Sequence, residues 1–226
     1  MSTDATGLPS DVGGAINTGL NAAASSVASA GARHVRSLDE RLTLIGVRAT
    51  YVSFSFFFAC FFFAIVYLQL VNENGLWLPK GIDHPASALG VIETAAVLLA
   101  GLAYFWGQWG GLYQRNFARL SLGLWAAAIL CLISVITHII ELHSPGFSLQ
   151  GGGYVSCFVA LEGTLTALLV VVTVILFGVA NRARLGLFAE SGVAIEAFGE
   201  FVGWMSAIAL MTFLALYVQP FFPSGG

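Results

Sequence analysis

The chain has 226 residues, of which 58% are hydrophobic and only 9% are charged, and its formal net charge is −3. Water-soluble domains carry about 25% charged residues, so this composition excludes a soluble enzyme and a disordered polypeptide. No basic run stands outside the expected turns, and nucleic acid is therefore not an expected partner. The composition predicts an integral membrane protein.

Residues 1–46 are rich in Ala, Gly and Ser and are interpreted as a cytoplasmic N-terminal extension. Val12, Ile16, Leu20 and Val27 recur at helical intervals, which fits an amphipathic helix on a membrane or on a partner subunit. A disordered segment fits the same composition, so both alternatives stay open. Residues 47–226 are expected to form the membrane domain.

Five stretches are long and apolar enough to cross a membrane, which takes about 20 residues of helix. They cover residues 49–71, 87–110, 120–141, 154–180 and 200–222. Backbone groups in lipid must find partners within their own segment, so the stretches are expected to be helices. The predicted fold class is all-α, an integral membrane bundle of five transmembrane helices.

Positive charge is unevenly divided between the loops that join these stretches. One set of loops and flanks holds Arg33, Arg36, Arg41, Arg48, Arg115, Arg119, Arg182 and Arg184, whereas the other set holds only Lys80. Because positively charged flanks stay in the cytoplasm, the N-terminus is predicted to be cytoplasmic and the C-terminus outside.

Four ionisable residues lie inside the predicted helices, where such groups are costly and mark candidate functional sites. Glu93 and Glu162 are about 10 Å inside the outer ends of their helices. His138 and Glu141 are three residues apart and therefore share one helix face. If the second, third and fourth helices are neighbours, these residues converge in an intramembrane polar cluster.

The favoured interpretation of the cluster is structural: His138 pairs with Glu141 or Glu162, one carboxyl group is protonated, and the cluster holds helices together. On this interpretation the chain has no metal site. Imidazole plus carboxylates also suits zinc, iron or copper, so His138, Glu141 and Glu162 are candidate metal ligands in an alternative interpretation. A proton relay or a quinol-headgroup site is a further alternative.

No catalytic or cofactor-binding residues are predicted, because the chain has no phosphate-binding loop, no nucleophile elbow and no opposed histidines for haem. Cys60, Cys131 and Cys157 stand singly in apolar runs and are expected to be small buried hydrophobic residues. Glu196 and Glu200, one turn apart, are interpreted as complementing the dipole at the start of the fifth helix.

Three segments follow one another in the membrane domain: GLWLPKGIDHP, HIIELHSPGFSLQGGGYVSCFVALEG and VAIEAFGEFVGW. In order and spacing they resemble subunit III of the haem-copper oxidases, in a five-helix form without the family's first two helices. The residues on family positions are Glu141, Phe147, Tyr154, Ser156, Phe158, Gly163 and Glu196. Leu165, Leu168 and Gly203 stand where the family has histidines, and Ser206 where it has an aspartate, which is typical of a divergent member.

The resemblance implies a non-catalytic accessory subunit of a respiratory haem-copper oxidase in a bacterial cytoplasmic (inner) membrane. Its partners would be catalytic subunit I, the other subunits and membrane lipid. Haem and copper would be held by the partner subunits, and phospholipid would be bound. An accessory subunit of a nitric oxide reductase and a quinol-interacting subunit are alternatives. A small metal-handling or transport protein that uses Glu93, His138, Glu141 and Glu162 is another.

Overall fold

The computed structural model describes residues 10–71, 77, 87–143, 152–188 and 192–218, and every regular element in these ranges is a helix. The elements are α1 (Ser10–Leu70), α2 (Ser87–Leu112), α3 (Phe117–Leu142), α4 (Gly153–Arg184), α5 (Val193–Phe213) and a short π-helical segment, η1 (Leu214–Val218). The expected all-α architecture is therefore confirmed. The fifth helix starts at Val193, earlier than its apolar stretch indicates.

Five helical segments among the described residues have the length and apolar composition of membrane spans. They are Glu40–Leu70, Ala88–Leu112, Phe117–Leu142, Gly153–Arg184 and Val193–Val218. Each exceeds the roughly 20 residues that a crossing needs. The chain is therefore a multi-pass membrane protein.

The chain divides into two compact units, Met1–Ile45 and Gly46–Gly226. In the first unit the chain is helical from Ser10 onward, as part of α1. The second unit contains the rest of α1 together with α2 to α5, and all contacts described below lie within it. Val47 of α1 is partly buried and packs against the common core.

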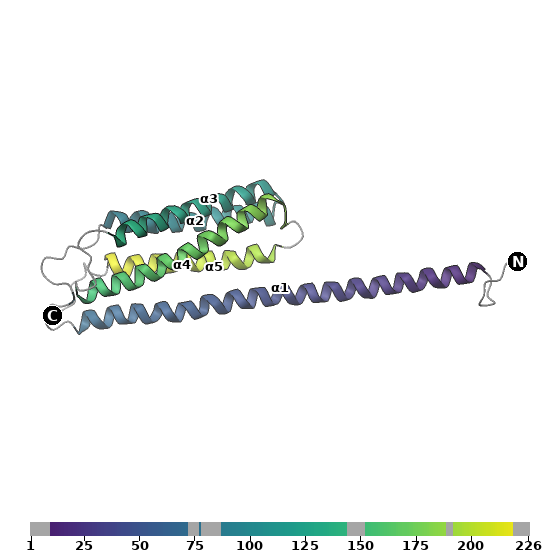
Figure 1. Ribbon diagram of the computed structural model, residues 1–226, viewed down its shortest axis with the longest axis horizontal. Coiled ribbons are helices and arrows are strands. Elements are labelled where there is room, and N and C mark those ends of the chain that lie inside the picture. Colours follow the sequence, from purple (N-terminus) through teal and green to yellow (C-terminus); the bar gives the residue numbers. More distant parts are fainter. Residues whose placement is uncertain (1–9, 72–76, 78–86, 144–151, 189–191, 219–226) are drawn as a thin grey trace. The chain divides into compact units, whose positions relative to one another are not determined.

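In the second unit α3 packs between α2 and α4, and α5 packs against α2 (Figure 1). Helix α1 meets α5 through long side chains. The indole Nε1 of Trp204 donates a hydrogen bond of 2.8 Å to Oγ of Ser55, and the Trp204 ring packs edge-on against Phe58. Arg48 of α1 forms an ion pair with Glu200 of α5. These contacts attach α1 to the bundle.

Two glycines bring the backbones of α2 and α3 close together. A Cβ atom added to Gly123 would lie 2.5 Å from Cα of Gly107 and 2.7 Å from the carbonyl oxygen of Ala103. Both of those atoms belong to the backbone of α2, so only a residue without a side chain fits at Gly123. This approach sets the separation of the two helices that carry Glu93 and His138.

We expect Gly123→Ala to lower the stability of the bundle by about 1–3 kcal/mol, because the added methyl group forces α2 and α3 apart. Gly178→Ala is the matched control, since a Cβ atom there has nothing within 4 Å. Thermal unfolding of both variants in detergent, followed by circular dichroism, measures the difference. Equal melting temperatures for the two variants would contradict the close helix contact.

Candidate functional site

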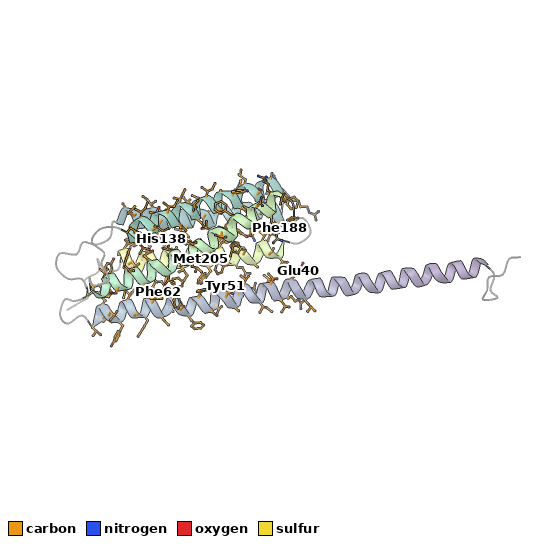
Figure 2. All side chains as sticks on the ribbon, in the orientation of Figure 1. Glu40, Tyr51, Phe62, His138, Phe188 and Met205 are labelled. Carbon is orange, nitrogen blue, oxygen red and sulfur yellow. The ribbon has the colours of Figure 1, made fainter. Side chains whose placement is uncertain are left out.

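The four ionisable residues expected inside the membrane come from three neighbouring helices. Glu93 lies in the second turn of α2, His138 and Glu141 lie near the end of α3, and Glu162 lies in the third turn of α4. All four side chains are about 2% exposed. His138 and Phe188, which follows the end of α4, lie at opposite ends of the bundle (Figure 2).

Glu93, His138 and Glu162 converge on one point. Nδ1 of His138 lies 2.8 Å from Oε2 of Glu162 and 3.1 Å from Oε2 of Glu93. All three atoms lie within 4.8 Å of one another. Neither close contact has the geometry of a hydrogen bond, and all three atoms are buried without any hydrogen-bond partner. The residues are thus brought together, but the atoms that face one another are not conventionally paired.

Glu141 lies beside this triad. Its carboxylate interacts electrostatically with Glu162 and His138 and lies close to Glu93 and Tyr217. Both of its oxygens are buried without a hydrogen bond of good geometry. The described residues therefore place three carboxyl groups and one imidazole within one small volume.

Hydroxyl groups fix the backbone around the cluster. Oγ of Ser134, one turn before His138, donates a hydrogen bond of 3.2 Å to the carbonyl oxygen of Glu93. Because Ser134 and His138 share one face of α3, the same face contacts both the backbone and the side chain of Glu93. Within α4, Oγ1 of Thr166 donates to the carbonyl oxygen of Glu162. Of these two contacts, the bond from Ser134 joins α3 to α2 and so helps to set their register.

Tyr217 of η1 lies against Glu93 and is a member of the site that was not predicted from the sequence. Its hydroxyl donates to Oε1 of Glu93 at 3.4 Å. Its ring lies so close to Gly90 that a Cβ atom there would be 2.5 Å from the ring carbon Cζ. Gly90 and Glu93 are one turn apart on α2, so the missing side chain at Gly90 makes room for the ring. The signal in the sequence is a tyrosine at the same predicted depth as Glu93 and Glu162.

Tyr154 stabilises the segment that carries Tyr217. Its hydroxyl donates a buried hydrogen bond of 2.8 Å to the carbonyl oxygen of Leu216. A π-helical turn interrupts the regular backbone pairing of an α-helix, so its carbonyl groups need other partners. Tyr154 supplies one of these partners from α4.

No buried Lys or Arg compensates the carboxyl groups among the described residues. The buried polar side chains there are Glu93, Thr94, Ser134, Thr137, His138, Glu141, Glu162, Thr166, Thr173 and Thr212. His138 is therefore the single basic side chain in this set. An unpaired charge in a medium of low dielectric constant is expensive, so protons or a bound cation must balance the cluster.

Other expected residues have different environments. Cys131 is buried and Cys157 partly buried, but Cys60 is exposed, so the expectation of burial is wrong for Cys60. The cause is its place on α1, which meets the bundle along one side. Glu196 lies in the first turn of α5, whereas Glu200 pairs with Arg48 through hydrogen bonds of 2.7 and 2.9 Å.

Several residues used in the sequence comparison lie outside the described ranges. They are Phe147 and the segment GLWLPKGIDHP, which includes Lys80, except for Trp77. Trp77 accepts a backbone hydrogen bond from Tyr154 and packs edge-on against its ring.

No known protein-family model matches the chain, and no curated protein matches it. Fold and site together define a multi-pass helical membrane protein with a buried cluster of glutamates and one histidine.

We expect Tyr154→Phe to destabilise the bundle by about 1–3 kcal/mol, because the buried carbonyl group of Leu216 loses its hydrogen bond. Tyr113→Phe is the matched control, because it removes the same hydroxyl group from a side chain that is 77% exposed. Chemical or thermal unfolding in detergent compares the two. Equal stability of the two variants would show that the Tyr154 hydroxyl does not hold η1 in place.

Proposed function

We propose that the chain is a non-catalytic accessory subunit of a respiratory haem-copper oxidase in a bacterial cytoplasmic membrane. The proposal rests on one observation, the burial of residues in the segment 138–163 that stand on positions of the resembled family. Tyr154 and Phe158 are fully buried, Glu141 is nearly so, and the two aromatic rings pack 6.2 Å apart. Three of the residues on family positions are therefore part of the buried core at this end of the bundle, whereas Ser156 is exposed.

The low burial of helix α1 within the chain supports a role in assembly. Only 11% of its most apolar window is buried within the chain, against 39–50% for the other four spans. Phe56 and Phe63 are each 72% exposed. Such a helix needs an apolar neighbour, and in this proposal the neighbours are catalytic subunit I and bound phospholipid.

In this proposal the redox chemistry takes place in the partner subunits. Haem and copper belong to catalytic subunit I and the subunits around it, and this chain contributes packing and stability. The second candidate is an accessory subunit of a nitric oxide reductase, which the same resemblance supports. The two differ in the gas that the assembled complex consumes.

We expect the tagged full-length chain, purified from its native membranes in mild detergent, to carry haem-containing subunits with it. Oxygen uptake by the eluate supports the oxidase, and nitric oxide uptake supports the reductase. The double variant Phe56→Ala/Phe63→Ala should recover several-fold less haem. Val174→Ala, at an exposed position on α4, is the control and should recover the wild-type amount.

Recovery of the folded wild-type chain without haem, under conditions that keep the native haem complexes intact, would refute the accessory role. Equal haem recovery with all variants would show that α1 is not the contact surface.

The proposed orientation has the N-terminus in the cytoplasm. The exposed residues Gln114, between α2 and α3, and His143, at the end of α3, mark opposite ends of the bundle. In a background without native cysteines, His143→Cys should react with a membrane-impermeant thiol reagent in intact cells. Gln114→Cys should react only after permeabilisation. The reverse pattern would invert the topology.

A further inference from the structure

Three buried polar atoms face one another without hydrogen bonds: Oε2 of Glu93, Oε2 of Glu162 and Nδ1 of His138. Buried polar atoms in native proteins are almost always paired, so three orphaned atoms at one point need an explanation. The other oxygen of Glu93, Oε1, accepts a hydrogen bond from Tyr217. The unpaired atoms are therefore the ones that point into the centre of the cluster.

The spacing of these atoms matches that of ligands around one metal ion. Nitrogen and oxygen donors about 2.0–2.2 Å from an ion lie about 3 Å from adjacent donors in octahedral coordination and about 3.4 Å from one another in tetrahedral coordination. Nδ1 of His138 is 2.8 Å and 3.1 Å from the two carboxylate oxygens. The three ligand atoms lie within 4.8 Å of one another, a span that one ion can bridge.

Charge balance favours the same conclusion. Two carboxylates and a neutral imidazole carry a charge of −2, which a divalent cation neutralises, and Glu141 adds a further carboxyl group beside them. No buried Lys or Arg among the described residues supplies this charge. In a membrane interior, a neutral assembly costs far less than an uncompensated one.

We propose that Glu93, His138 and Glu162 bind one divalent transition-metal cation that ties α2, α3 and α4 together. One imidazole and two carboxylates suit zinc, iron or manganese rather than ions that need thiolate ligands. Glu141 lies next to the three ligands and strengthens the negative potential that attracts the cation. A metal-bound cluster differs from the metal-free interpretation that the sequence favours. It does not depend on the proposed accessory role.

The test uses the full-length chain, purified alone in detergent with a tag that lacks histidine. The protein is treated with a chelator, incubated with zinc chloride, desalted and analysed by elemental mass spectrometry. We expect about one zinc ion per chain and a higher melting temperature with zinc than without. Cobalt substitution should give visible absorption bands of a coordinated ion.

The variants Glu93→Gln, His138→Gln and Glu162→Gln should each lower zinc affinity by tenfold or more, as expected for loss of a ligand. Glu141→Gln should have a smaller effect. His143→Gln, directly after the end of α3, and Glu196→Gln on α5 are matched controls, because both residues are exposed. Both controls should bind zinc like the wild type.

Circular dichroism and gel filtration establish that each variant is folded. If His138→Gln does not fold, Glu162→Gln, which keeps the side-chain volume, carries the comparison together with the zinc-dependent melting of the wild type. A folded wild type that retains no zinc would overturn the proposal, as would equal zinc loss in cluster and control variants. Neither result bears on co-purification with haem, so the two proposals fail separately.

Discussion

The burial of three carboxyl groups and one imidazole inside an apolar helix bundle is the constraint on which this end of the molecule depends. Taking one ionised group out of water costs several kcal/mol even after local relaxation. The chain offsets only part of this cost, with the imidazole of His138 between Glu93 and Glu162 and the hydroxyl group of Tyr217 on Glu93. Helix separation, the space at Gly90 and the π-helical segment η1 all serve to bring these groups together.

The exposed ion pair between Arg48 and Glu200 differs in its energetics from the buried cluster. It has short hydrogen bonds of 2.7 and 2.9 Å, yet its side chains are 55% and 35% exposed. Exposed ion pairs contribute little to stability, because water already solvates both charges. The pair orients α1 against α5, whereas removal of a partner from the buried cluster would leave a charge without compensation.

The sequence predicts the five helices well, because an apolar stretch of sufficient length has only one stable form in lipid. It also identifies Glu93, His138, Glu141 and Glu162, since ionisable residues stand out against an apolar background. It does not predict which atoms meet. That depends on which faces of α2, α3 and α4 pack together, and helices that are apolar all round carry no pattern that reveals this.

Residues with ordinary local roles were the hardest to predict. Tyr217 resembles any aromatic residue at a membrane interface until the π-helical turn places it over Gly90. Arg48 and Glu200 are 152 residues apart, and each has a sufficient local explanation, one as a topological signal and the other as part of a helix start. Such contacts arise from the packing of whole helices, which propensity and spacing do not encode.

Because the cluster is enclosed by protein, a substrate cannot reach a metal ion bound there. Catalytic metal sites keep a coordination position open to substrate, whereas structural sites are closed by protein. Glu93, His138 and Glu162 are each about 2% exposed, and Tyr217 lies over Glu93. A cation held there would brace three helices without reaching a substrate. A closed metal site of this kind is physically compatible with the non-catalytic role proposed above.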